Sequence, residues 1–217
     1  VWAAEATKSD CEMRCFQFAV KWFWLPLRLA VGISKPRRKI RGGYFAGEIA
    51  SVGASVTDYS VGDQVFGAAG LKFGAYGEYV GLPANSTVVA KPGNMSFEEA
   101  AAVPLGGLNA LHFMRKARIQ LGEKVLINGA GGSIGAHAVQ IAKSLGAHVT
   151  AVDSTLKEGM LRRIGADDFI DYEKQDFAAS SQSFDVILDM VAGSSYSACI
   201  NTLNPCGRYL MANPSLV

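Results

Sequence analysis

A run of small residues between an apolar segment and an amphipathic one limits the fold of this chain more than any other feature. Residues 125–128 have the pattern of a buried strand, and residues 129–132 lead from it directly into a helix that begins at Ser133. Small residues let the main chain approach a bound group closely, and N–H groups at a helix N-terminus bind a pyrophosphate. The pattern therefore predicts a dinucleotide site, and Gly135 is expected to let the helix pack tightly on the strand. The predicted contacts are Ala130, Gly131, Gly132, Ser133, Ile134 and Gly135.

Strands and helices alternate after this turn. Amphipathic helices are predicted between the apolar runs, and such an alternation indicates an α/β fold in which right-handed crossovers join the strands of one parallel sheet. The predicted helices cover residues 133–145 and 156–164, and the predicted strands lie at 149–152, 169–170, 186–188 and 209–211.

The first half of the chain has a different pattern. Short alternating apolar runs, separated by turn residues, predict a β-barrel-like region from 41 to 89. Ser96, followed by Glu98, Glu99 and an alanine-rich apolar run, is typical of a helix start. A second helix is predicted from 107 to 117, before the buried strand.

Two charged side chains after the second strand of the α/β region favour different cofactors. Asp153 ends that strand about 20 residues after the glycine-rich turn, where an acidic side chain can hold a ribose diol and favours NAD. Lys157 could instead pair with a 2′-phosphate, with Ser154 donating a hydrogen bond, which favours NADP. A simpler interpretation also stays open, in which Asp153 caps the next helix and Lys157 is a solvated cation.

Composition argues against several other classes of function. The 21 basic and 19 acidic residues give a net charge of +2 and are spread along the chain, so we expect no nucleic-acid partner. The four cysteines have no paired spacing and nothing near Val1 resembles a secretory signal, which favours a reducing, cytoplasmic location. The three histidines lack the spacing of metal ligands.

An aromatic and apolar segment at 16–33 is the candidate for membrane contact. Lys21, Pro26 and Arg28 interrupt it, whereas a spanning helix needs about 20 mostly apolar residues. We therefore expect no membrane span and predict a buried or substrate-lining segment. Interfacial contact through the aromatic residues 22–24 is the alternative.

The chain resembles the medium-chain dehydrogenase/reductase superfamily, specifically its zinc-free quinone-oxidoreductase-like branch. The resemblance covers nearly the whole chain and rests on motifs at 46–49, 52–53, 61–67, 74–79, 97–101, 128–135, 140–143, 165–167 and 170–172. It implies a partial GroES-like β-barrel domain for substrate binding over residues 1–106. Over residues 107–217 it implies part of a Rossmann domain, a doubly wound parallel sheet that binds a dinucleotide.

The resemblance also implies an activity. Members of this branch transfer hydride from NAD(P)H to a quinone or an α,β-unsaturated carbonyl compound in a cleft between the domains, mainly through positioning and electrostatics. The implied substrate is small and apolar. Thr7 and Asp10 would lie at the nicotinamide side as the catalytic residues. The further cofactor contacts are Asn109, Asp153, Ser154, Lys157, Tyr172, Met190 and Val191.

No catalytic zinc ion is expected. The zinc alcohol dehydrogenases of the superfamily have a Cys three residues before the Asp that Asp10 resembles, a His before the Gly-Glu segment, and a third ligand further on. Those places hold Thr7, Gly43 and Leu105 here, and the four-Cys lobe is absent. None of the three is an ordinary zinc ligand.

Two departures from the family pattern leave the cofactor preference open, with NADP(H) favoured. Asn109 stands where the family usually has Thr, and Asp153 stands where NADPH-preferring members often have a smaller or neutral residue. Full-length members extend further at both ends, so we expect a fragment of a homodimeric protein. The alternatives are a non-catalytic NAD(P)-binding or interaction protein on the same fold and a zinc-free alcohol dehydrogenase.

Overall fold

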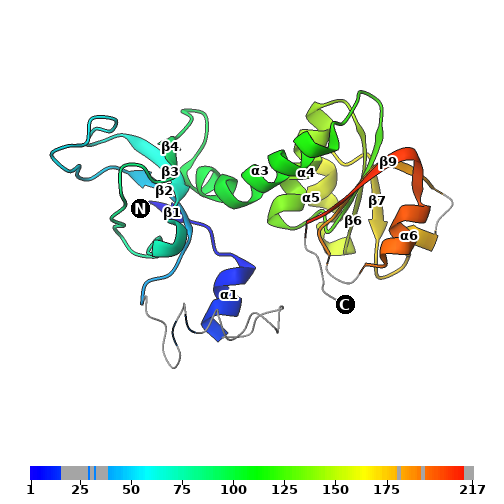
Figure 1. The fold of residues 1–217 in the computed structure, drawn as a ribbon, viewed down its shortest axis with the longest axis horizontal. Coiled ribbons are helices and arrows are strands. Elements are labelled where there is room, and N and C mark those ends of the chain that lie inside the picture. Colours follow the sequence, from blue (N-terminus) through cyan, green and yellow to red (C-terminus); the bar gives the residue numbers. More distant parts are fainter. Residues whose placement is uncertain (16–28, 30–31, 33–38, 180–181, 192–193, 213–217) are drawn as a thin grey trace. The chain divides into compact units, whose positions relative to one another are not determined.

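A computed structural model describes residues 1–15, 29, 32, 39–179, 182–191 and 194–212 (Figure 1). Their contacts divide the chain into two compact units, Val1–Pro104 and Leu105–Val217. Each unit has a sheet and an apolar core of its own. Most of the aromatic segment 16–33, for which a substrate-lining role is predicted, lies outside the described residues.

The first unit is built on an antiparallel sheet, as the β-rich pattern predicts. Its four strands lie in the order β1 (Ala3–Ala4), β2 (Tyr44–Glu48), β3 (Gln64–Ala68) and β4 (Val88–Ala90). Phe45 and Val65 form a core with Ala75, and Val65 alternates with less buried neighbours along β3. The helix α1 (Lys8–Cys15) follows β1, and the single turn η2 (Gly70–Lys72) follows β3.

The second unit contains the predicted doubly wound parallel sheet. Its strand order is β7-β6-β5-β8-β9, and every pair of neighbours is parallel. The chain therefore moves outward from β5 to β7 and then crosses back to β8, so the order reverses between β5 and β8. The strands are β5 (Lys124–Asn128), β6 (His148–Asp153), β7 (Asp168–Asp171), β8 (Phe184–Asp189) and β9 (Leu203–Met211).

Both faces of this sheet are covered. Val125 and Ile127 pack with residues of α3, α4 and α5, whereas Leu126, which points to the opposite face, packs in a separate cluster with Cys199 of α6. Strands with two buried faces have nearly continuous apolar sequences, which explains the runs seen in the sequence. The helices are α3 (Phe97–Ala117), α4 (Ser133–Ser144), α5 (Glu158–Arg163) and α6 (Tyr196–Asn201), with the turns η3 (Thr155–Lys157) and η4 (Phe177–Ala179).

The prediction of two helices before β5 is wrong, because α3 is one continuous helix with Pro104 inside it. Its start agrees with the sequence. The Ser96 N–H donates to Glu99 Oε2 over 2.8 Å and the Glu99 N–H donates to Ser96 Oγ over 3.1 Å, a reciprocal capping box. Proline removes one hydrogen bond inside the helix. The helix continues past Pro104 because Ala110, Met114 and Ala117 are buried in the core of the second unit.

Candidate functional site

The turn between β5 and α4 is held at the carboxyl end of β6. The N–H groups of Gly129 and Ala130 both donate to the carbonyl of Val152, over 3.0 and 3.1 Å. Gly129 has a φ of 81°, a left-handed conformation that favours glycine. The first helical hydrogen bond of α4 runs from Ala136 N to Gly132 O over 2.9 Å. The N–H groups of the preceding first turn have no carbonyl within their own helix to bind.

Gly131 and Gly135 occupy places that have no room for a side chain. A Cβ on Gly131 would lie 2.9 Å from Asp153 Oδ2 and would collide with the Lys157 chain. A Cβ on Gly135 would lie 2.7 Å from Ala130 Cα and would collide with the Gly129 carbonyl. Gly135 thus permits close packing of α4 on the turn, and Gly131 permits close approach of the turn to Asp153 and Lys157.

The Asp153 carboxylate links the turn to the residues that follow β6. Asp153 is buried and accepts hydrogen bonds from Gly131 N over 2.7 Å and from Ser154 N over 2.9 Å. Lys157 Nζ lies 3.1 Å from Asp153 Oδ1. The helical turn that follows has Ser154 as its N-cap and no side-chain cap, so the interpretation of Asp153 as a helix cap is wrong. The two residues that favour different cofactors form one ion pair.

Tyr172 and Asn109 differ in their relation to this turn. Tyr172 follows β7, is 59% exposed, and donates its N–H to the Asp153 carbonyl over 3.3 Å. Asn109 lies exposed on α3, and its amide donates to Leu105 O of the same helix over 2.8 Å. The structure therefore brings Tyr172 next to Asp153, whereas the described hydrogen bond of Asn109 stays within its own helix.

Met190 and Val191 lie on the other side of the turn. A Cβ on Gly129 would be 3.2 Å from Met190 Cβ and 3.2 Å from Val191 Cγ2. The Met190 N–H donates to the Asn128 carbonyl over 3.0 Å. The end of β8 thus continues directly along the glycine-rich turn.

Beneath this contact lies a buried polar network that the sequence analysis does not identify. Asp189, which is 1% exposed, accepts from Asn128 Nδ2 over 3.0 Å, and Tyr209 Oη donates to Asp189 Oδ2 over 2.8 Å. Burial, followed by the hydrogen bond to Asp189, raises the pKa of Tyr209. A signal was present, because Asn128 and Asp189 are polar residues at the carboxyl ends of two apolar strands.

In the first unit, Thr7 and Asp10 bind one another at the start of α1. Thr7 Oγ1 donates to Asp10 Oδ2 over 2.6 Å, the Thr7 N–H donates to the same oxygen over 3.0 Å, and the Asp10 N–H donates to Thr7 Oγ1 over 3.2 Å. This is the geometry of a helix cap. Asp10 is 7% exposed. Burial and the hydrogen bond to Asp10 raise the pKa of the nearby Tyr76 to about 12.

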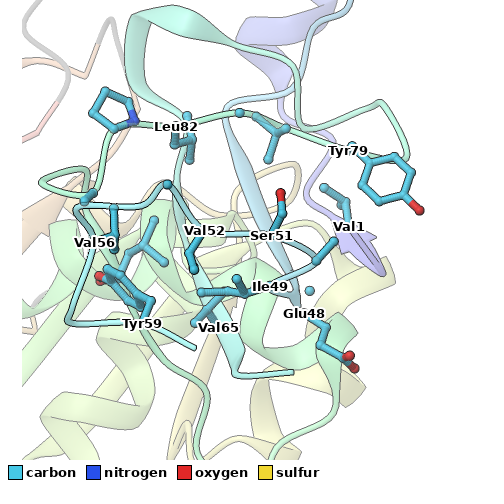
Figure 2. A pocket seen from close by; sticks show the side chains of 18 of the residues that line it. Val1, Glu48, Ile49, Ser51, Val52, Val56, Tyr59, Val65, Tyr79 and Leu82 are labelled. Atoms are coloured by element: carbon cyan, nitrogen blue, oxygen red, sulfur yellow. The ribbon is translucent and has the colours of Figure 1, made fainter. Parts of the chain in front are cut away.

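A cavity of about 340 Å³ lies in the first unit (Figure 2). Figure 2 shows Ile49, Val56, Tyr59 and Val65 gathered at one side of it, and the Tyr59 hydroxyl donates to the Val88 carbonyl over 2.9 Å. Ile49, Tyr59 and Val65 also belong to the apolar core of the unit. Thr7 and Asp10 do not line the cavity. Most of its lining residues are apolar, and Glu48 and Ser51 are the polar exceptions besides two tyrosines.

The three positions to which the resemblance assigns zinc ligands have no ordinary zinc-binding side chain. The Thr7 hydroxyl donates to Asp10, Gly43 has no side chain, and Leu105 is apolar. In the part of the chain that the structure describes, no group of three or more His, Cys, Asp or Glu side chains is arranged to hold a metal. None of the described helices is long and apolar enough to cross a membrane.

Comparison with known proteins agrees with both units. Residues 3–93 match the "Alcohol dehydrogenase GroES-like domain" family and residues 133–212 match the "Zinc-binding dehydrogenase" family. The chain is 37% identical over 178 residues to Polyketide synthase GfsB of Streptomyces halstedii, and 35% identical over 165 residues to 2-methylene-furan-3-one reductase of Solanum lycopersicum. These matches cover 81% and 72% of this chain but 3% and 42% of those proteins.

A solved structure has a similar fold. The quinone oxidoreductase from Coxiella burnetii superposes with a TM-score of 0.76 at 27% identity, over 96% of this chain and 64% of that one. The chain thus spans less than half of the two curated relatives and about two thirds of this structural neighbour. The two matched domains, the strand order and the glycine-rich turn place the chain in the medium-chain dehydrogenase/reductase superfamily.

Proposed function

We propose that this chain is part of an NAD(P)H-dependent, zinc-independent oxidoreductase that reduces a quinone or an α,β-unsaturated carbonyl compound. The observation that carries the proposal is the β5 to α4 turn, where Gly135 lets α4 pack closely on the turn and Asp153, at the end of the next strand, accepts a hydrogen bond from Gly131. The names of two similar proteins, a 2-methylene-furan-3-one reductase and a quinone oxidoreductase, support this substrate class.

The residues of the second unit suit the parts of a dinucleotide. The cofactor, when bound, supplies a hydride to an electron-poor carbon or quinone. The first turn of α4 binds the pyrophosphate through main-chain N–H groups, and Asp153 accepts from the ribose in place of its bond to Gly131. Ser154, Lys157 and Tyr172 lie on the side of Asp153 where the adenosine ribose would sit.

We propose NADP(H) as the preferred cofactor. Lys157 is held 3.1 Å from Asp153, so a cation is already present where a 2′-phosphate would otherwise meet a bare carboxylate. A 2′-phosphate would take this cation from Asp153, whereas the 2′-hydroxyl of NADH would use the carboxylate itself. NADPH is therefore preferred when the Lys157 ammonium group binds the 2′-phosphate more strongly than it binds the Asp153 carboxylate.

Thr7 and Asp10 remain proposed catalytic residues. Their hydrogen bonds give each a structural role at the start of α1, and the buried carboxylate beside Tyr76 supports a further electrostatic role. Without a metal ligand set, reduction would depend on orientation of the substrate and on hydrogen bonds to its oxygen. The homodimer and the cytoplasmic location also remain predictions.

Calorimetric titration of the chain with NADPH and with NADH tests the cofactor proposal. We expect wild-type protein to bind NADPH more tightly, and Lys157→Gln to weaken NADPH binding by about tenfold or more while changing NADH binding by less than about twofold. Lys143→Gln is the matched control, because Lys143 pairs with Asp167 on another part of the unit. Folded wild-type protein that binds neither nucleotide would disprove the proposal.

Turnover separates an enzyme from a protein that only binds the nucleotide. We expect the absorbance of bound NADPH to fall when a small quinone or an enone is added, and to stay constant with a saturated ketone. Binding without oxidation by either acceptor would favour the non-catalytic alternative. Oxidation of a simple alcohol with NADP⁺ would favour the zinc-free alcohol dehydrogenase.

A further inference from the structure

The polar network around Asp189 lies at the point where the order of the parallel sheet reverses. Asn128 at the end of β5 and Asp189 at the end of β8 are paired in register. In doubly wound sheets a ligand lies outside the carboxyl ends of the strands at this reversal. Asp153, the predicted partner of the adenosine ribose, lies on the β6 side of β5. The nicotinamide half of a dinucleotide would therefore face the residues that follow β8.

Asp189 ties these residues to the sheet. Its Oδ1 accepts from Val191 N over 3.0 Å and from Ser194 Oγ over 3.2 Å, in addition to Asn128 Nδ2. The Asn128 amide also donates to Ser194 Oγ, over 3.1 Å. The Asp189 carboxylate and the Asn128 amide thus hold Val191, which lies against Gly129, and Ser194, which follows it. Their effect is to fix where Met190 and Val191 stand beside the glycine-rich turn.

The chemistry of the network suits a role in orienting the residues after β8 better than a role in stabilising the fold. All four described donors to the Asp189 carboxylate are neutral, namely Asn128 Nδ2, Val191 N, Ser194 Oγ and Tyr209 Oη. A buried carboxylate loses its hydration, and neutral donors compensate for that loss only when all of them are correctly placed. An apolar side chain would fill the same space without this requirement. A fully buried acid is therefore most useful where it holds a binding surface in one geometry.

We propose that Asp189 is a positioning residue that holds the segment containing Met190 and Val191 as a fixed wall for the nicotinamide half of the cofactor. This inference rests on the proposed function, because it presupposes a dinucleotide on the β5 to α4 turn. It assigns to Asp189, Asn128, Ser194 and Tyr209 a role that acts through the wall and involves no contact with the cofactor. Loss of the hydrogen bonds to the Asp189 carboxylate should therefore weaken the binding only of ligands that carry nicotinamide.

The test compares two ligands and two ends of the same strand. Binding of NADPH and of its fragment without nicotinamide, 2′-phospho-ADP-ribose, is measured by calorimetry for wild type, Asp189→Ala and Asp185→Ala. Asp185 lies at the opposite end of β8 and also binds neighbouring strands, accepting from Lys124 N over 2.8 Å and from Asn204 Nδ2 over 2.8 Å. Ser194→Ala removes one of the hydrogen bonds to Asp189 at a half-buried position. This variant replaces Asp189→Ala in the test if Asp189→Ala does not fold.

We expect Asp189→Ala to weaken NADPH binding by about tenfold and to change binding of the fragment by less than about twofold. Asp189→Asn keeps an oxygen for the Val191 N–H and should restore most of the affinity, and Asp185→Ala should bind both ligands like wild type. Equal losses for the two ligands, or the same loss in Asp185→Ala, would show a general structural role and overturn the inference. Wild-type protein that binds neither ligand would instead overturn the proposed function, and this inference with it.

Discussion

At the scale of single residues, an added methyl group should have opposite consequences at two glycines of the second unit. At Gly135 the new Cβ would lie 2.7 Å from both Cα and O of Ala130, and backbone atoms cannot move aside cheaply. At Gly159, inside α5, it would meet nothing within 4 Å. We expect Gly135→Ala to lower the free energy of unfolding by about 1–3 kcal/mol. Gly159→Ala should raise it by up to about 1 kcal/mol, because alanine favours the helix.

Far-UV circular dichroism during urea unfolding measures both effects, because the two substitutions lie in helices of the second unit and the sequence has no tryptophan after position 24. The two substitutions add the same atoms to helices of the same unit, so each is the control for the other. Similar destabilisation by both would contradict the assignment of Gly135 to close packing of α4 against the β5 turn.

At the scale of elements, carboxylates join the amino-terminal ends of β5, β8 and β9. Glu123 lies 2.5 Å from Arg208, and Asp185 accepts from Lys124 N and from Asn204. The hydrogen bond from Arg208 lowers the pKa of Glu123, and the bond from Asn204 lowers the pKa of Asp185. A folded pKa below the unfolded value means that the stabilisation is present above the unfolded pKa, near 4, and is lost as the pH falls through the folded pKa.

We therefore expect the free energy of unfolding to fall on acidification below about pH 4.5, and Asp185→Asn to reduce that fall. The variant should be less stable than wild type at pH 7, and the difference should shrink at pH 3. Urea midpoints at several pH values measure this. Asn204→Ala, which removes the donor and keeps the acid, should flatten the profile in the same direction. Parallel profiles for wild type and both variants would show that Asp185 does not titrate differently on folding.

The elements that the sequence predicts correctly are those encoded by neighbouring residues. The buried strand before the glycine-rich turn, the helix after it and the Ser96 cap each depend on a few consecutive positions. The single helix α3 was missed because Pro104 resembles a helix boundary, and only the core contacts further along the helix carry it through. The Asp189 network was missed because its bonds join residues far apart in the chain, and strand register decides them.

The site was predictable to a similar extent. Periodicity and spacing identify the turn and Asp153, because a strand, a small-residue turn and a second strand follow one another in a fixed order. They do not identify the ion pair between Asp153 and Lys157, since whether the side chains meet depends on the path of the chain after β6. The role of Thr7 and Asp10 as a helix cap was equally hidden by the resemblance to a catalytic pair.

At the scale of the whole molecule, the two compact units imply that the cofactor stabilises them unequally. Binding raises the free energy of opening only for the unit that holds the site, by about 2.7 kcal/mol at a ligand concentration of 100 times Kd. We expect NADPH to raise the free energy of opening that governs hydrogen exchange of the core amides in β5, β6 and β8 by roughly this amount. The core amides of β2 and β3 belong to the other unit and should exchange at unchanged rates.

The same exchange experiment tests the catalytic prediction for the first unit. If Thr7 and Asp10 meet the bound cofactor, the amides at the start of α1 should gain local protection even though the β2 and β3 core does not. Thr7→Ser keeps the cap and Thr7→Ala removes it, so local protection that depends on the hydroxyl should persist in the first variant only. Equal exchange at the start of α1 with and without NADPH would restrict these two residues to capping the helix. Slowing of the β2 and β3 core by the full amount would show that both units open together.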